Sequence, residues 1–165
     1  GGSTGISDAL KYAERFADGD NIAVILGDNT TDEDIRAAAE AFTTGAQVFL
    51  KEVADPQRFG VPKFNAQNPA QVDEIIEKPQ NPPSNYAVTG LYFYDSTVFD
   101  KIKSLKPSDR GELEVTDLNN AYIKEGKLTW AKLEGFWSDA GTFESLYRTG
   151  AYWAAKKLGL TKAEK

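Results

Sequence analysis

The sequence contains no cysteine, no histidine and no methionine. Without cysteine the chain can form no disulfide and can use no thiolate chemistry. Without histidine it lacks the side chain that most often acts as a general base near neutral pH, which is also the commonest ligand of transition metals. Any catalysis must therefore use carboxylates, amines, hydroxyls, backbone groups or a hard cation held by oxygen ligands.

Long apolar runs are also missing. No stretch approaches the roughly 20 residues needed to span a bilayer, and no basic segment precedes a signal-like apolar core. We therefore expect a soluble, cytoplasmic protein without a membrane partner. The net charge of −6 argues against nucleic acid as a partner, because binding a phosphate backbone requires clustered Lys and Arg. A phosphorylated small molecule is compatible with this charge if a divalent ion neutralises it.

Residues 22–29 read IAVILGDN, an apolar run that ends in a glycine, a carboxylate and an amide. Such a run predicts a strand buried on both faces, in the middle of a parallel sheet. Ligands of open α/β sheets bind at the carboxyl ends of the strands, which makes Asp28 a candidate site residue. On these residues alone, an ordinary turn after the strand explains Asp28 and Asn29 equally well.

The rest of the chain alternates between helical and strand patterns. Helices are expected over residues 5–16, 30–42, 96–104, 115–125 and 142–158, the last with Thr142 as its N-cap. Strands are expected over residues 46–53, 61–65, 72–76, 86–94 and 128–133, with the second and third forming an antiparallel pair. Residues 1–165 should form a single α/β domain, with a mixed, mostly parallel sheet flanked by helices.

A second acidic position follows near the end of the chain. Asp139 lies in the segment WSDAGT, directly before a helix start. If Asp28 and Asp139 meet at one sheet edge, they form a hard oxygen site, and Mg²⁺ typically takes one or two carboxylates and completes its shell with water and phosphates. Asp139 could equally be an acid that favours the helix dipole. Glu77 and Lys78 could be a surface ion pair, and residues 110–112 a solvated loop.

Six segments considered together resemble the sugar-phosphate nucleotidyltransferases, and in particular the glucose-1-phosphate thymidylyltransferases. They are LGDN (26–29), RFGV (58–61), EKP (77–79), SNYAVTGLY (84–92), RGELEVTD (110–117) and WSDAGTFES (137–145). The resemblance covers the chain from Gly5 onward. It implies a Rossmann-like, glycosyltransferase-A-like fold and the condensation of dTTP with glucose 1-phosphate to dTDP-glucose and pyrophosphate.

The resemblance also implies roles for individual residues. Asp28 and Asp139 correspond to the aspartates that hold Mg²⁺, and Gly5 corresponds to a glycine that contacts the nucleotide base. Contacts to the sugar and its phosphate fall on Gly60, Glu77, Lys78, Val88 and Arg110, with Glu112 as a further candidate. Asp28, Lys78, Arg110 and Asp139 would form the catalytic set, because a lysine and an arginine can hold the attacking phosphate while a metal stabilises the α-phosphate.

The sequence departs from the family pattern at its beginning. Family members start with a strand and a glycine-rich loop containing an arginine, whereas this chain starts Gly1-Gly2-Ser3 and contains no such loop. We therefore expect a domain truncated at its N-terminus, inactive by itself, that forms a homodimer or takes the missing part from a partner chain. It resembles the short form of the family. The alternatives are a noncatalytic fragment that binds a sugar phosphate or a partner, or a nucleotidyltransferase for another sugar 1-phosphate or nucleoside triphosphate.

Overall fold

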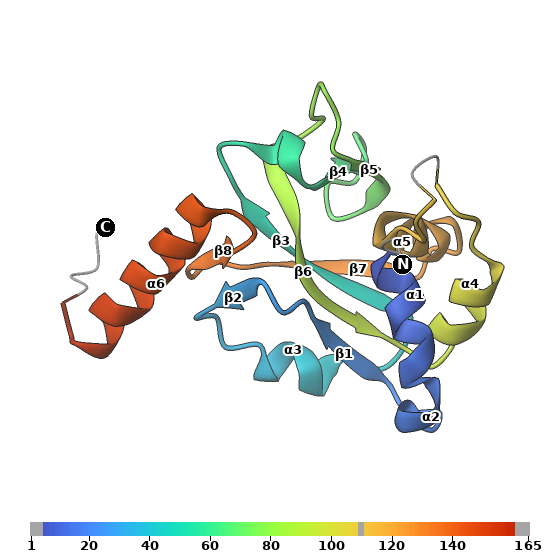
Figure 1. Cartoon of the computed structure of the whole chain (residues 1–165). Helices are drawn as coiled ribbons and strands as arrows, with labels where there is room; N and C mark the ends of the chain where they lie inside the picture. The colour runs from blue at the N-terminus through green and yellow to red at the C-terminus, as the bar shows by residue number, and fades with distance from the viewer. Residues whose placement is uncertain (1–4, 109–110, 161–165) are drawn as a thin grey trace.

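The computed structural model describes residues 5–108 and 111–160. A four-stranded sheet in the order β1-β6-β3-β7 is formed by β1 (Ile22–Ile25), β3 (Ala46–Glu52), β6 (Tyr86–Tyr94) and β7 (Leu128–Lys132) (Figure 1). The predicted mixed sheet is confirmed. β6 runs antiparallel to both β1 and β3, and only β3 and β7 are parallel, so these four strands do not form the mostly parallel sheet that was expected.

β1 corrects the expectation of a central strand buried on both faces. It lies at the edge of the sheet and pairs with β6 alone. Ile22 and Val24 are partly buried against the core, whereas Ala23 and Ile25 are exposed. The apolar run predicted a strand correctly, but local composition carries no information about how many neighbours the strand has.

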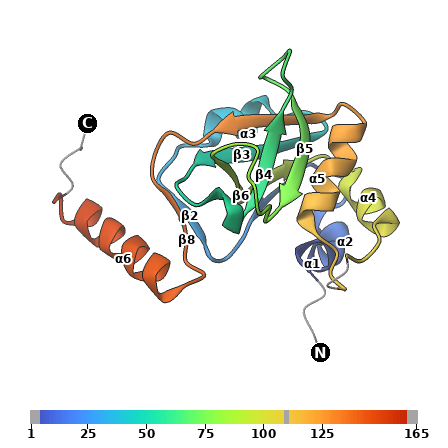
Figure 2. The same ribbon diagram turned by 90° about the horizontal axis from the view of Figure 1, so that it is seen from above.

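Side chains of β6 alternate between two cores, because successive residues of a strand point to opposite faces. Tyr92 and Tyr94 belong to the larger core, and Leu91 and Phe93 to the smaller one. The larger core is covered by the helical segments α1 (Ile6–Leu10), η1 (Lys11–Ala13) and α2 (Glu14–Ala17), and by α4 (Val98–Ser104) and α5 (Val115–Lys124). The helix α3 (Arg36–Ala41) covers the smaller core, and Figure 2 shows the sheet between these two layers.

Two small antiparallel pairs lie beside the main sheet. β4 (Gly60–Phe64) and β5 (Val72–Glu77) form the predicted hairpin, which follows the short helix η2 (Pro56–Arg58). β2 (Asn29–Thr31) pairs with β8 (Trp137–Asp139), a contact that was not predicted.

The helix expected from residue 30 is wrong over its first turns. Thr30 and Thr31 belong to β2, and α3 begins only at Arg36. The Thr31 hydroxyl donates a hydrogen bond of 2.8 Å to the carbonyl of Phe136. Because β-branched residues fit a pleated strand well, a nearby partner strand overrides the helix-start pattern here.

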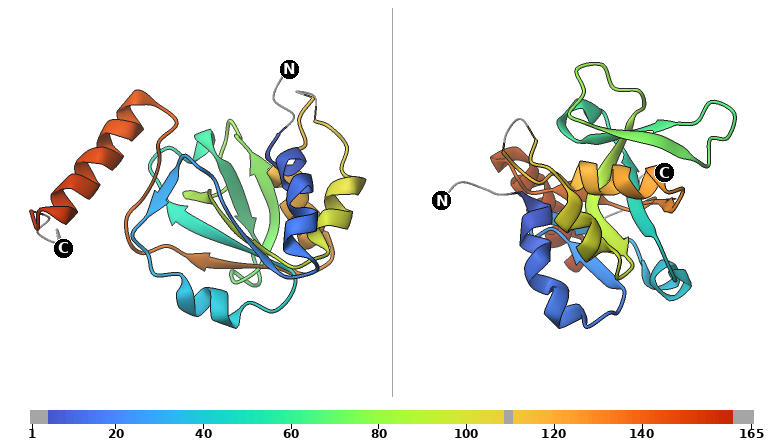
Figure 3. Two further views of the ribbon diagram at one scale, coloured as in Figure 1. Left: turned by 60° about the horizontal axis from the view of Figure 1, so that its bottom comes forward. Right: turned by 90° about the vertical axis from the view of Figure 1, so that its right-hand side faces the viewer.

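The terminal helix α6 (Phe143–Lys157) agrees with the prediction, including its cap. The Thr142 hydroxyl accepts a hydrogen bond from the Ser145 N–H at 3.1 Å, and the Ser145 hydroxyl accepts one from the Thr142 N–H at 3.1 Å. Figure 3 shows α6 extending away from the sheet. Within the described residues, no helix is long and apolar enough to cross a membrane.

Candidate active site

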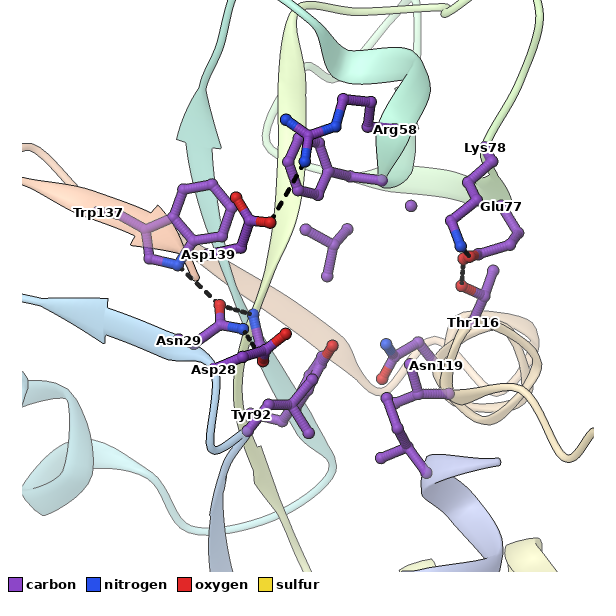
Figure 4. Close-up of a pocket in the computed structure, with 17 residues that line it drawn as sticks. Asp28, Asn29, Arg58, Glu77, Lys78, Tyr92, Thr116, Asn119, Trp137 and Asp139 are labelled. Carbon is purple, nitrogen blue, oxygen red and sulfur yellow. Dashed lines mark hydrogen bonds and ion pairs between the residues drawn. The ribbon is translucent and has the colours of Figure 1, made fainter. Parts of the chain in front are cut away.

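A cleft of about 290 Å³ opens where β1, β6, the β4–β5 hairpin, α5 and β8 meet (Figure 4). It is lined by six residues that the sequence had singled out: Asp28, Gly60, Glu77, Lys78, Val88 and Asp139. These residues come from five separate segments of the chain, so only the fold brings them together.

Asp28 and Asp139 converge at one end of this cleft. Asn29 lies opposite Asp139 in the β2–β8 pair, and the Ala140 N–H donates a hydrogen bond of 2.6 Å to the backbone carbonyl of Asp28. A β-carbon built on Gly141 would lie 3.3 Å from Oδ2 of Asp139 and 3.6 Å from Oδ2 of Asp28. The two oxygens are therefore separated by no more than the sum of these distances.

The open space in front of Gly141 has one carboxylate oxygen of Asp28 and one of Asp139 beside it. Two carboxylate oxygens face a point that any side chain at residue 141 would fill, and Mg²⁺ binds through one or two carboxylates plus water and phosphate oxygens. The described residues contain no group of three or more acidic side chains that could hold a metal by themselves. Such an ion would therefore need ligand oxygens from a bound phosphate or from water.

Asn29 fixes the position of Asp28, a role that the sequence did not reveal. Its Nδ2 donates a hydrogen bond of 2.9 Å to Oδ1 of Asp28. Its Oδ1 accepts hydrogen bonds from the Gly90 N–H at 2.8 Å and from Nε1 of Trp137 at 2.9 Å. A glycine inside a strand often marks the close approach of another group, and at Gly90 of β6 this group is the Asn29 amide.

Arg58 brings a positive charge to Asp139 and was also missed. Its Nη2 lies 3.3 Å from Oδ2 of Asp139, and its Nη1 lies 2.9 Å from Oδ2 of Asp55. The hydrogen bond to Asp55, and then the charge of Asp139, raise the pKa of Arg58, while its partial burial acts in the opposite direction. The guanidinium also lies over the Phe59 ring, 5.2 Å from its centroid. The only sequence signal for Arg58 was its place as the first residue of the RFGV segment (58–61).

Glu77 and Lys78 lie on the opposite wall of the cleft. Oε2 of Glu77 accepts a hydrogen bond of 2.6 Å from the Thr116 hydroxyl, and Oε1 lies 3.6 Å from Nζ of Lys78. Lys78 has a φ of 44°, which costs free energy in a residue other than glycine and is commonest where function requires it. The Glu77–Lys78 ion pair is therefore part of the cleft rather than an isolated surface pair.

The cleft is also lined by the aromatic side chain of Tyr92 and the amide side chain of Asn119. Tyr92 is buried there, and burial followed by the negative charges of Glu77 and Asp28 raises its pKa, so its hydroxyl stays protonated. Oδ1 of Asn119 accepts a hydrogen bond of 2.7 Å from the Tyr94 hydroxyl. Nδ2 of Asn119 is buried beside the cleft and has no partner among the described residues. Nothing in the sequence had identified this amide.

Three predicted residues are not among those that line the cleft. Gly5 precedes α1 with a φ of 89°, and a β-carbon there would lie 2.6 Å from the Leu113 carbonyl oxygen; its neighbour Ile6 does line the cleft. Glu112 lies outside the lining, and its carbonyl accepts a hydrogen bond from the Ser108 N–H at 2.8 Å. Arg110 lies outside the described residues.

Comparison with known proteins gives a consistent result. Residues 2–155 match the family described as nucleotidyl transferase. The chain is 44% identical over 155 residues to the glucose-1-phosphate thymidylyltransferase of Neisseria meningitidis serogroup A, covering 90% of this chain and 53% of that protein. It is 42% identical over 154 residues to the same enzyme from Xanthomonas campestris pv. campestris, with 90% and 52% covered. The chain spans about half the length of the curated relatives it matches.

Solved structures agree with this comparison. A Bacillus anthracis protein, provisionally assigned as a glucose-1-phosphate thymidylyltransferase and crystallised with sucrose, is 50% identical with a TM-score of 0.84, covering 92% of this chain and 62% of that one. A UDP-glucose pyrophosphorylase in complex with UDP-glucose gives a TM-score of 0.82 at 22% identity, covering 94% and 64%, which shows a shared fold alone. The predicted Rossmann-like nucleotidyltransferase fold is thereby confirmed.

Proposed function

Because the chain belongs to the nucleotidyl transferase family, we propose that it forms the sugar-phosphate and metal-binding part of an enzyme that condenses glucose 1-phosphate with dTTP. The products are dTDP-glucose and pyrophosphate. The observation that supports this most directly is the convergence of Asp28 and Asp139 at one end of a cleft whose other wall carries Glu77 and Lys78.

In the proposed reaction, a phosphate oxygen of glucose 1-phosphate attacks the α-phosphorus of dTTP. The bond from the α-phosphorus to the oxygen that bridges it to the β-phosphorus breaks, and pyrophosphate leaves with that electron pair. A phosphate monoester is already ionised at neutral pH, so the nucleophile needs no general base. The chemistry is therefore compatible with a chain that has no histidine. What remains for the protein is to position the reactants and stabilise charge.

On the sugar side, the ammonium of Lys78 would bind the phosphate of glucose 1-phosphate. The carboxylate of Glu77, held by Thr116, would accept hydrogen bonds from sugar hydroxyls. Gly60 faces Glu77 across the β4–β5 hairpin and has no side chain to narrow the cleft, so its backbone can approach the sugar. Val88 lines the same wall.

On the nucleotide side, Asp28 and Asp139 would hold Mg²⁺. When bound, the ion supplies positive charge to the phosphate oxygens at which negative charge builds up. Asn29 keeps the Asp28 carboxylate in place through its hydrogen bond. Arg58 partly neutralises Asp139, and its second contact with Asp55 holds it at the rim of the cleft.

Three further roles rest on the resemblance of sequence segments alone. Gly5 would contact the base, Arg110 would share the sugar phosphate with Lys78, and Glu112 would assist in sugar binding. A cytoplasmic location belongs to the same proposal, because nucleoside triphosphates and sugar phosphates are charged and do not cross a bilayer unaided. Another sugar 1-phosphate or nucleoside triphosphate would use the same chemistry, and competition between substrates distinguishes these cases.

A second candidate function is sugar-phosphate binding without catalysis. The cleft supports it because the sugar-phosphate side, with Glu77 and Lys78, is built entirely from the described residues. Binding and orientation of the triphosphate supply many kcal/mol of the barrier reduction in such reactions. We therefore expect the 165-residue chain alone to bind glucose 1-phosphate without measurable turnover.

The test separates binding from catalysis. Calorimetric titration with glucose 1-phosphate should show binding that Lys78→Ala weakens by roughly tenfold or more, because a charge-assisted contact to phosphate is lost. Lys63→Ala, which removes an exposed lysine on the same hairpin outside the cleft, is the matched control and should leave affinity unchanged. Equal effects of both variants would refute the assigned cleft. Pyrophosphate release at ordinary enzyme rates by the chain alone would refute the expectation of inactivity.

A further inference from the structure

One buried amide that lines the cleft is only half satisfied by the protein. Asn119 of α5 is 1% exposed, and its Nδ2 is one of three buried side-chain atoms that find no hydrogen-bond partner among the described residues. The other two, the hydroxyls of Ser7 and Thr149, do not line the cleft, whereas Asn119 does. A buried N–H donor without an acceptor costs free energy, so its presence requires an explanation.

The orientation of this amide is set by Tyr94. The Tyr94 hydroxyl donates a hydrogen bond of 2.7 Å to Oδ1 of Asn119. Burial raises the pKa of Tyr94, so the hydroxyl keeps its proton and remains a donor. Because Oδ1 is held in this way, Nδ2 is the group left for another partner. Figure 4 shows the amide pointing from α5 toward the space between Tyr92 and Thr116.

The next residue in the chain shows how a structural asparagine is satisfied in the same helix. Oδ1 of Asn120 accepts a hydrogen bond of 2.8 Å from the Ile75 N–H, and its Nδ2 donates one of 2.8 Å to the Ile75 carbonyl. Asn120 thus uses both ends of its amide to attach β5 to α5, and it does not line the cleft. Asn119 uses only its oxygen within the protein, which leaves its donor group for a ligand.

The surroundings of Asn119 favour an uncharged acceptor. Thr116, one helical turn before Asn119, donates its hydroxyl hydrogen bond to Glu77. Burial, and then the negative charges of Glu77 and Asp28, raise the pKa of Tyr92 in the same cleft. These charges would also repel a phosphate group seated beside Asn119. The oxygen of a sugar hydroxyl accepts a hydrogen bond without bringing charge, and its proton can be donated to a carboxylate.

We propose that Asn119 is a specificity-determining residue of the cleft, whose Nδ2 donates a hydrogen bond to the oxygen of one hydroxyl of the bound sugar. The proposal rests on the proposed function, which places the sugar beside Glu77. A sugar phosphate that lacks this hydroxyl would leave the buried N–H group unpaired, so the site should reject it. Discrimination of this kind is stronger than an apolar pocket can achieve.

Calorimetric titration of the 165-residue chain with deoxy sugars tests the contact. The ligands are glucose 1-phosphate and its 2-, 3-, 4- and 6-deoxy analogues. The parent chain should bind one of these analogues roughly tenfold more weakly than glucose 1-phosphate, through loss of the hydrogen bond to Asn119. Asn119→Leu, a change of similar volume, should bind glucose 1-phosphate roughly tenfold more weakly and no longer distinguish it from that analogue. A merely structural effect would weaken all five ligands alike.

Two further variants separate the contact from effects on folding. Asn119→Leu leaves the Tyr94 hydroxyl without its acceptor, whereas Tyr94→Phe/Asn119→Leu removes both polar partners and should be better tolerated. The double variant should lose the same discrimination, and circular dichroism verifies its fold. Asn120→Leu is the matched control, because it removes an amide that lies outside the lining of the cleft. It should retain the ratio of affinities that the parent chain shows.

The outcomes distinguish this inference from the proposed function. A parent chain that does not bind glucose 1-phosphate, or binds it equally well after Lys78→Ala, overturns both. Binding that depends on Lys78 but shows no preference for glucose 1-phosphate over any analogue overturns this inference alone. So does a folded double variant that still discriminates as the parent chain does.

Discussion

Replacing Gly90 with alanine tests how the site holds its acidic end in place. Gly90 lies in β6, and the side chain of Asn29 packs directly on its α-carbon. A β-carbon at this position would lie 2.5 Å from Nδ2 and 2.6 Å from Cγ of Asn29. Contacts this short do not occur between a real β-carbon and another heavy atom, so the Asn29 amide must move.

The cost follows from the hydrogen bonds that Asn29 would lose. It accepts one from the Gly90 N–H and one from Nε1 of Trp137, and it donates one to Asp28. Each such bond contributes about 0.5–1.5 kcal/mol net, so Gly90→Ala should lower the free energy of unfolding by about 2–4 kcal/mol. That is a large part of the roughly 5–15 kcal/mol typical of a domain.

Urea unfolding followed by circular dichroism measures this cost. Gly27→Ala is the matched control, because Gly27 directly precedes Asp28 in the chain. A β-carbon added there would meet no atom within 4 Å beyond its chain neighbours. It should change stability by no more than about 0.5 kcal/mol.

A double substitution identifies the cause. In an Asn29→Ala background the obstacle is gone, so Gly90→Ala should cost much less than it does in the parent chain. The reasoning is refuted if Gly90→Ala costs the same in both backgrounds, or if it costs no more than Gly27→Ala in the parent chain.

Three further outcomes are expected. Arg58→Gln should raise the affinity for Mn²⁺ by roughly three- to tenfold, because the guanidinium no longer competes for Asp139. Mn²⁺ serves as a spectroscopic substitute for Mg²⁺, and its binding is measured by electron paramagnetic resonance. Unchanged or weaker binding would contradict this reasoning. Burial by itself would raise the pKa of Asp95, but hydrogen bonds, first among them one from Thr97, lower it below its usual value. The stability that this carboxylate contributes is thus present above the unfolded-state pKa of about 3.9 and is lost as the pH falls through the lower folded-state pKa. The difference in unfolding free energy between the parent chain and Asp95→Asn should accordingly shrink below about pH 4, and a constant difference would refute the assignment. Thr142→Ala should lower the free energy of unfolding by about 1 kcal/mol through loss of the helix cap, and no loss in urea unfolding would show that the cap is dispensable.

Local sequence patterns determined most individual elements. The aromatic and β-branched run of β6 made it a strand, the turn residues between β4 and β5 made them a hairpin, and Thr142 set the start of α6. Each of these depends on interactions within a few residues, which a sequence displays directly. The same holds for Asp28 and Asp139 as candidates, because Asp28 follows a strand pattern and Asp139 directly precedes a helix start.

The tertiary structure alone decided how these elements meet. β1 has the composition of a central strand but lies at an edge of the sheet. Residues 30 and 31 have a helix-start pattern but form a strand that pairs with β8, more than 100 residues away. Asn29 acquires its role because the fold brings Gly90 and Trp137 to its side-chain oxygen, and Arg58 because the fold brings Asp139 beside it. Such long-range pairings depend on the free energy of the whole packed chain, so the sequence could nominate the two aspartates but not the amide and the guanidinium that hold them.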